Sequence, residues 1–208
     1  MKFTELRRAY LDFETTGFIL KKDEIVETAI VTIEPNSKGR QVRTYSERYN
    51  PGFHIPTEVS RIHKIYDKDV VGKPKFEEKL DEMLEFISGV EILIAYNGMA
   101  FDRPFVINSI ADKSRQSIEE LPRALSLQWI DPFLIFQSGI IDAIVPPGSR
   151  TLTAMCKAFG VNIGRAHSAE DDTIAMAKMF EKIVGDILPD DIDKLEELTA
   201  LGLEKTSD

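Results

Sequence analysis

The order of apolar segments along this chain of 208 residues constrains its fold more than any other feature. Three consecutive stretches, at about Leu6–Phe13, Ile25–Ile33 and Gln41–Tyr49, have the composition of strands, and turn-forming residues at 15–17 and 35–39 separate them. The second stretch is rich in β-branched residues, which favours a central position in the sheet. Helical periodicities then alternate with short apolar runs. This order predicts an α/β fold in which a mixed β-sheet is flanked by α-helices.

The later elements are predicted from side-chain periodicity. Phe76–Ile87 places its apolar residues on one helical face, and Ile92–Tyr96 is a short apolar run typical of a buried strand. Pro104 and the apolar residues behind it predict a helix after Asp102. The remaining expected elements are a short strand at 129–130 and helices at 132–137, 152–159, 168–183 and 191–201.

Composition excludes several classes of protein. The longest apolar runs fall far short of the ~20 residues that a membrane-spanning helix needs, so no membrane contact is expected. The first residues lack the apolar core of a secretory signal. The single cysteine, Cys156, cannot form an intrachain disulfide, and one Cys with three His cannot build the usual zinc clusters. We therefore expect a cytoplasmic protein in a reducing environment.

The acidic charge is concentrated at one end of the chain. Of the formal net charge of −9, residues 186–208 carry −6 through 8 acidic residues and 2 lysines, which leaves −3 for residues 1–185. The global charge therefore does not exclude a nucleic-acid partner. We predict one domain over 1–185 and an acidic C-terminal tail over 186–208. Ile192, Leu195 and Leu198 recur at every third position, which predicts a short helix that docks on a partner protein or covers the core.

Two carboxylates stand at the end of the first predicted strand. Asp12 and Glu14 are two residues apart, so their side chains share one face of the strand, ~6–7 Å apart. Like charges at this distance repel each other unless a cation lies between them. Taken alone, such a pair is more often a solvated strand end.

Asp172 is a charge at a position where a core residue is expected. Apolar residues follow it at offsets of 3, 4, 7, 8 and 11, so Asp172 begins the core-facing stripe of its helix. A buried carboxylate needs a partner, either an arginine or a metal ion. Ser168, three residues before Asp171, resembles a helix N-cap. His167 lies five residues before Asp172, which favours an acid–base role for its imidazole.

Together these residues resemble the DEDDh branch of the DEDD 3′–5′ exonucleases, a proofreading-exonuclease-like family. Its first motif corresponds to Asp-Phe-Glu-Thr-Thr-Gly at 12–17 and its second to Asn-Gly-Met-Ala-Phe-Asp at 97–102. Its third, a His followed after four residues by Asp, corresponds to 167–172, and a further family-like stretch lies between 49 and 65. The related branch has Tyr where this chain has Ser168, so the His branch fits better. The chain departs from the family in Arg7 and Arg8, because such first strands are usually more apolar.

The resemblance implies a ribonuclease-H-like fold and two divalent cations, Mg²⁺ or Mn²⁺. The implied ligands are Asp12, Glu14, Asp102 and Asp172, and an all-oxygen set agrees with hard cations. His167 is the implied general base, and the product is a nucleoside 5′-monophosphate. On its own, Asp102 would be interpreted as the N-cap of a helix.

The resemblance also implies a substrate, namely single-stranded nucleic-acid 3′ ends. DNA is favoured, in a proofreading or repair role. The implied substrate contacts are Thr15, Asn97, Phe101 and Arg165, and Tyr96 is an alternative to Phe101 for packing against bases. An exoribonuclease remains an alternative. A non-catalytic nucleic-acid-binding module is disfavoured because all five motif residues are intact. The tail is a candidate contact for a polymerase or another protein.

Overall fold

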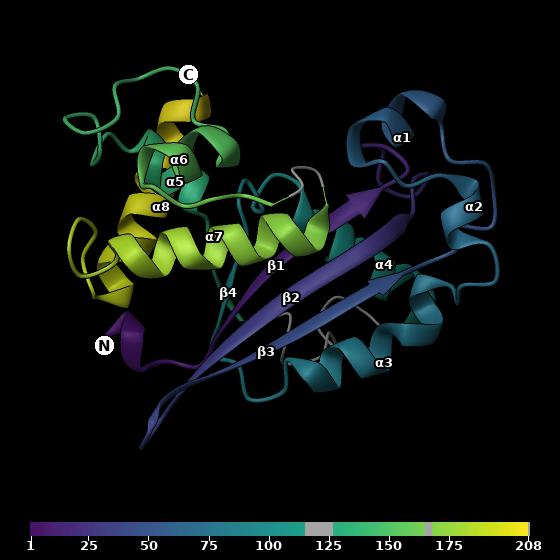
Figure 1. The fold of residues 1–208 in the computed structure, drawn as a ribbon, viewed down its shortest axis with the longest axis horizontal. Coiled ribbons are helices and arrows are strands. Elements are labelled where there is room, and N and C mark those ends of the chain that lie inside the picture. The colour runs from purple at the N-terminus through teal and green to yellow at the C-terminus, as the bar shows by residue number, and fades with distance from the viewer. Residues whose placement is uncertain (115–126, 165–167, 208) are drawn as a thin grey trace.

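A five-stranded mixed sheet forms the centre of the molecule (Figure 1). The computed structural model describes the backbone of residues 1–114, 127–164 and 168–207, and the side chains of 1–108, 127–164 and 168–206. The strands lie in the order β3-β2-β1-β4-β5. Strands β1, β2 and β3 pair antiparallel, whereas β4 pairs parallel with β1 and with β5. The bounds are Arg8–Thr15, Ile25–Asn36, Gly39–Arg48, Ile92–Ile94 and Gln128–Ile130 for β1 to β5. The α/β class is confirmed.

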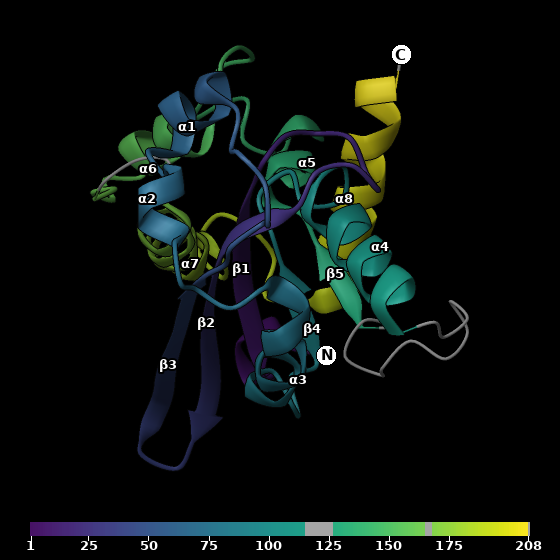
Figure 2. The same cartoon turned by 90° about the vertical axis from the view of Figure 1, so that its right-hand side faces the viewer.

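Strand β2 has the internal position that its β-branched composition predicts. It is buried without interruption from Ile25 to Ile33, because β1 and β3 pair with its two edges and its side chains pack into the core clusters on both faces of the sheet. The predicted turn at 35–39 is shorter than expected: β2 continues to Asn36, and β3 begins at Gly39, which has a φ of +127°. The resulting β2–β3 hairpin extends away from the helices in both views (Figures 1 and 2).

Helices cover both faces of this sheet. Alternate residues of β1 belong to different core clusters: Tyr10 packs with helix α7, whereas Ala9 and Leu11 pack with helices α3 and α4. Figure 2 shows α7 on one side of the strands and α4 on the other. The helices are α1 Thr57–His63, α2 Asp67–Val70, α3 Phe76–Phe86, α4 Asp102–Ser114, α5 Pro132–Gln137, α6 Leu152–Ala158, α7 Ala169–Ile183 and α8 Ile192–Ser207.

The sequence-based prediction differs from this fold in further places. Helix α8 continues to Ser207, six residues beyond the predicted end at 201. Helices α1 and α2 were not expected, because each is too short to show a helical periodicity. Strand β1 begins at Arg8 rather than at Leu6, because Phe3–Glu5 forms a 3₁₀ turn that ends at Leu6. No described helix is both long and apolar enough to cross a membrane.

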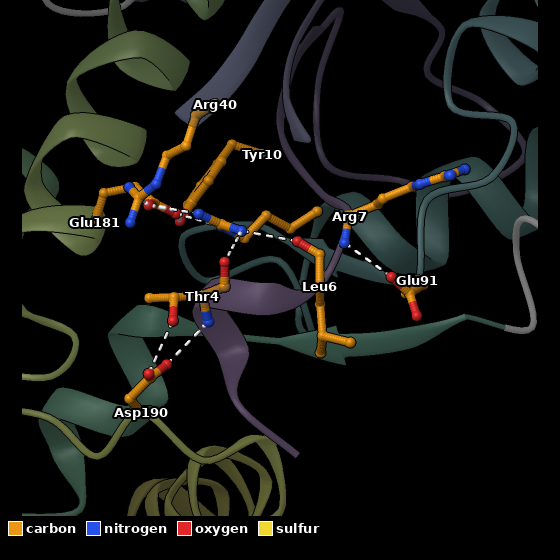
Figure 3. Close-up of polar contacts among 9 residues, drawn as sticks. Thr4, Leu6, Arg7, Tyr10, Arg40, Glu91, Glu181 and Asp190 are labelled. Atoms are coloured by element: carbon orange, nitrogen blue, oxygen red, sulfur yellow. Dashed lines mark hydrogen bonds and ion pairs between the residues drawn. The ribbon is translucent and has the colours of Figure 1, made fainter. Parts of the chain in front are cut away.

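Strand β1 begins with a buried basic residue, Arg8, whose charge is compensated by an ion pair. Its side chain is fully buried and donates to both carboxylate oxygens of Glu181 near the end of α7. The same carboxylate accepts hydrogen bonds from the Tyr10 hydroxyl and from Arg40 on β3, and these residues converge in Figure 3. Removing one partner of such a buried ion pair costs about 3–5 kcal/mol. This network therefore fixes the first strand against the far end of α7.

The C-terminal helix is part of the main core. Ile192 and Leu195 of α8 are buried in the same cluster as the apolar stripe of α7, and Leu198 packs against it. Gly202 lies so close to the Leu134 carbonyl of α5 that an added Cβ would clash with it. Of the two roles expected for this helix, the packing therefore supports the covering of the core.

Candidate active site

Three carboxylates meet where β1 passes under the start of α7. Asp12 and Glu14 come from the C-terminal half of β1, and Asp172 comes from the first turn of α7. Each of the three offers an oxygen, and these oxygens all lie within 4.8 Å of one another. Asp12 and Glu14, which share a strand face, therefore lie beside Asp172, the charged residue on the apolar stripe of α7.

Asp102 approaches the same point from helix α4. The residue is 2% exposed, and its Oδ1 accepts a hydrogen bond of 3.2 Å from the backbone N–H of Phe13 on β1. Asp102 is the first residue of α4. A cleft of about 380 Å³ contains all four carboxylates, and its lining residues are Asp12, Phe13, Glu14, Phe18, Tyr96, Asn97, Ala100, Phe101, Asp102 and Asp172.

Burial and mutual repulsion make these groups hard to ionise together. Burial raises the pKa of Asp12 well above its ordinary value, and the charges of Asp102, Glu14 and Asp172 raise it further. Burial, followed by the nearby carboxylates, raises the pKa of Glu14 to about 8. Burial also raises the pKa of Asp102 to about 7, although backbone N–H groups oppose the shift. A cation bound among them would remove this penalty.

The donor set fits a hard divalent cation. Every group in the Asp12, Glu14 and Asp172 cluster is a carboxylate, and carboxylate oxygens are the ligands that Mg²⁺ and Mn²⁺ prefer. The cluster brings several negative charges within reach of one ion, in a partly buried cleft where water screens them less.

Only some of the residues expected to contact the substrate line the cleft. Asn97 and Phe101 line the cleft, as does Tyr96. Thr15 is buried, and its hydroxyl donates to the Gly17 carbonyl at 2.6 Å. Its side chain therefore stabilises the turn at the end of the first motif. His167 and Arg165 lie outside the described residues.

The sequence analysis missed the aromatic side chain at the mouth of the cleft. Phe18 is 74% exposed, and its ring centroid lies 5.6 Å from that of Phe101, which in turn lies 5.0 Å from that of Phe105. Ile19 and Leu20 beside it are also exposed. A run of three apolar residues directly after a turn glycine is the signal that could have indicated this exposed surface.

A second residue that was missed, Glu27, supports the start of α7. Ser168 occupies the predicted N-cap position, but its side chain makes no capping hydrogen bond. Instead, Glu27 on β2 accepts from the Ala169 N–H at 2.9 Å and pairs with Arg48 at 2.7 Å. Glu27 also stands opposite Glu14 in the strand register. No local pattern could indicate a contact between residues 142 positions apart.

Comparison with known proteins agrees with this geometry. A model of the exonuclease family matches residues 10–180. DNA polymerase III subunit epsilon of Rickettsia conorii is 32% identical over 185 residues, which cover 88% of this chain and 75% of the relative. The corresponding subunit of Treponema pallidum is 31% identical over 176 residues, which cover 83% and 74%.

A solved structure shows the same fold. Exonuclease I of E. coli, in complex with a dA16 oligonucleotide, superposes with a TM-score of 0.70 at 16% identity. The superposition covers 94% of this chain but only 42% of exonuclease I, so the chain spans about two fifths of that enzyme. The fold is therefore ribonuclease-H-like, and the chain belongs to the exonuclease family, among its DEDDh-type 3′–5′ exonucleases.

Proposed function

We propose that this protein is a metal-dependent 3′–5′ exonuclease that removes nucleoside 5′-monophosphates from the 3′ ends of single-stranded DNA. The observation that carries the proposal is the convergence of four carboxylates in one cleft that the aromatic rings of Phe18 and Phe101 also line. Two relatives are subunits of a DNA polymerase, and a structural neighbour binds a DNA oligonucleotide. These names favour DNA over RNA as the substrate.

The carboxylates have separate roles in this scheme. Asp12, Glu14 and Asp172 would hold one divalent cation, and Asp12 would share a second cation with Asp102. Two such cations, Mg²⁺ or Mn²⁺, supply positive charge to the attacking and leaving oxygens of the scissile phosphate. The carboxylates would fix the positions of the two cations. Asp12 on β1 and Asp172 on α7 are held in place because these two elements pack together.

His167 is the general base of the proposal. Its imidazole would take the proton from the water that attacks phosphorus, and proton transfer by a positioned side chain typically contributes ~10²–10⁴-fold to the rate. His167 lies two positions before Ala169, whose N–H donates a hydrogen bond to the Glu27 carboxylate. This hydrogen bond anchors the chain just after the third motif begins.

Aromatic and polar side chains of the cleft would hold the 3′-terminal nucleotides. The exposed ring of Phe18 and the half-buried ring of Phe101 form an apolar surface on which bases can stack, and such stacking is worth ~1–3 kcal/mol per base. Asn97 lines the same cleft and can donate to or accept from the nucleotide. Arg165 would contact a phosphate, and Thr15 would shape the turn beside the terminal sugar.

A polymerase partner follows from the relatives rather than from the cleft. Subunit epsilon is by name a component of DNA polymerase III. In the first half of α8 the apolar residues Ile192 and Leu195 are buried, whereas Leu201 and Leu203 in its second half are exposed. We therefore place the polymerase contact on the C-terminal half of α8.

Digestion of matched oligonucleotides tests the proposed function. With Mg²⁺ or Mn²⁺, a 5′-labelled single-stranded DNA should give a descending ladder, and a 3′-labelled one should release a labelled mononucleotide at once. EDTA and Asp12→Asn should abolish both. Faster digestion of the matched RNA would establish an exoribonuclease instead. Binding of the DNA without any product from the wild-type protein would indicate a non-catalytic module.

A further inference from the structure

We propose that Asp131 is a positioning residue for the reaction, because it holds the loop that presents Asn97, Phe101 and Asp102 to the cleft. The inference rests on the proposed function for its chemical consequence. Asp131 follows strand β5 and precedes helix α5, and its side chain is 1% exposed. Strand β5 pairs with β4, and the loop 97–101 leaves the end of β4.

The Asp131 carboxylate accepts hydrogen bonds from two parts of the chain. Its Oδ1 lies 3.0 Å from the Phe133 nitrogen and 3.4 Å from the Leu134 nitrogen, both in the first turn of α5. The same oxygen accepts from the Asn97 N–H at 2.9 Å. Its Oδ2 accepts from the Met99 N–H at 3.1 Å. One buried carboxylate therefore joins the start of α5 to the loop of the second motif.

This loop has an unfavourable backbone conformation that needs support. Asn97 has a φ of +59°, in the left-handed region, which asparagine tolerates better than most residues but adopts less readily than glycine. Gly98 packs so tightly on Ala95 that a Cβ at this position would clash. The residues before and after Gly98 both donate their N–H groups to Asp131, so these hydrogen bonds hold both sides of the sharp bend.

The position of Asp102 depends on the same loop. The Arg103 N–H donates to the Gly98 carbonyl at 2.9 Å, which ties the first turn of α4 to the bend. Asp102 is the first residue of α4 and contacts Phe13 between Asp12 and Glu14. A continuous set of contacts thus connects Asp131 to the carboxylate cluster. Because a displacement of ~1 Å can cost ~10²-fold in rate, a loosened loop should slow the reaction.

A simpler role for Asp131 is to cap helix α5, where Pro132 occupies the first turn. Two variants distinguish the roles. Asp131→Ser keeps a good N-cap but has too short a side chain to reach the loop amides as well. Asp131→Asn can keep the Oδ1 contacts, but it places an amide N–H against the Met99 N–H. As a matched control, Asp191→Ala removes a carboxylate that accepts from the Lys194 N–H at the start of α8.

Amide hydrogen exchange and steady-state kinetics together test the proposal. In Asp131→Ser, the Asn97 and Met99 amides should exchange at least ~10-fold faster, while Phe133 and Leu134 stay protected. The kcat/KM on single-stranded DNA should fall ~10–100-fold, as is usual when support of an active-site ligand is lost. Asp131→Asn should release Met99 alone, with a smaller loss. Asp191→Ala should lower the Tm but keep loop protection and kcat/KM.

Three outcomes would overturn the positioning role: unchanged exchange at Asn97 and Met99, a freed loop with kcat/KM within twofold of wild type, or an equal kinetic loss in Asp191→Ala. If Asp131→Ser does not fold, Asp131→Asn decides the question by the same two measurements. If the wild-type protein shows protected loop amides but degrades no DNA, the proposed function is wrong. The conclusion that Asp131 holds the loop 97–101 would still be supported.

Discussion

The buried carboxyl group of Asp102 accepts a hydrogen bond from the backbone N–H of Phe13, with 3.2 Å between Asp102 Oδ1 and the Phe13 nitrogen. Phe13 lies between Asp12 and Glu14, so this contact joins the second motif to the centre of the first. Asp102 therefore combines a structural contact on one oxygen with a carboxylate that faces the cleft.

Replacing Asp102 should separate these two roles. Asp102→Asn keeps an oxygen that accepts from Phe13 but loses the charge, so its Tm should equal or exceed that of the wild type without metal. Its kcat should fall by at least ~10²-fold, because ligand charge on a catalytic cation is worth several kcal/mol. Asp102→Ala should lose activity and also Tm, since it leaves the Phe13 N–H without its acceptor. Equal melting temperatures for both variants would contradict the structural role.

Asp12→Ala should abolish activity and stabilise the metal-free protein. Burial and four neighbouring carboxylates raise the pKa of Asp12, so its removal relieves repulsion in the folded state. A gain of ~1 kcal/mol corresponds to a rise in Tm of ~2–4 °C for a chain of this size. Thermal melts in EDTA and in Mg²⁺ test this prediction, because added Mg²⁺ should stabilise only the wild type. Substantial nuclease activity of Asp12→Ala would exclude Asp12 as a shared ligand.

The metal-free protein should become less stable as the pH rises from about 5 to 8. The pKa of Glu14 is raised to about 8 and that of Asp102 to about 7, mainly by burial, so the folded state keeps protons that the unfolded chain has already released. Stability then falls with pH in the window between the unfolded and folded pKa values. Denaturant melts from pH 5 to 9 should show this slope, and Glu14→Gln should flatten it. A metal-free protein that gains stability over this range would contradict these raised pKa values.

His167→Ala should leave divalent-cation binding largely intact and lower kcat by ~10²–10⁴-fold. In the wild type, kcat should rise with pH as the imidazole loses its proton, because only neutral His can accept one. The variant should lose this rise. Calorimetric titration with Mn²⁺ provides the control: if the variant no longer binds Mn²⁺, His167 is a ligand or a structural residue rather than the base.

The parts of the site that could be predicted are those with a local pattern. The spacing of Asp12 and Glu14 places them on one strand face, and the offsets behind Asp172 place it on a buried stripe. The apolar composition of Ile25–Ile33 predicted an internal strand, which the structure confirms.

The parts that could not be predicted depend on contacts between distant residues. Arg8 is paired with Glu181, which lies 173 positions away, so no window of sequence explains why a strand begins with a buried arginine. Asp131 looks like an ordinary N-cap before Pro132, and only the fold brings it beside Asn97. Phe18 was missed because strand and helix patterns indicate buried apolar faces rather than exposed rings.

Truncation after residue 185 should destabilise the domain more than it changes the chemistry. Residues 186–208 carry −6 of the net −9, and the four carboxylates of the cleft lie outside this segment. Yet Ile192 and Leu195 are buried against the core, and burying one such side chain is worth ~1.5–3 kcal/mol. The 1–185 fragment should therefore melt well below the full chain, by ~6 °C or more.

The charge of the tail can be tested without removing its packing. Asp193 and Glu197 are exposed on α8, so Asp193→Asn with Glu197→Gln should keep the Tm while weakening repulsion of the phosphate backbone. Affinity for single-stranded DNA should then hold or improve, chiefly at low salt, where charges act over longer distances. A fragment that melts like the full chain would show that residues 186–208 form a separable appendage. A double variant that binds DNA more weakly would show that these acids contribute to the binding surface rather than oppose it.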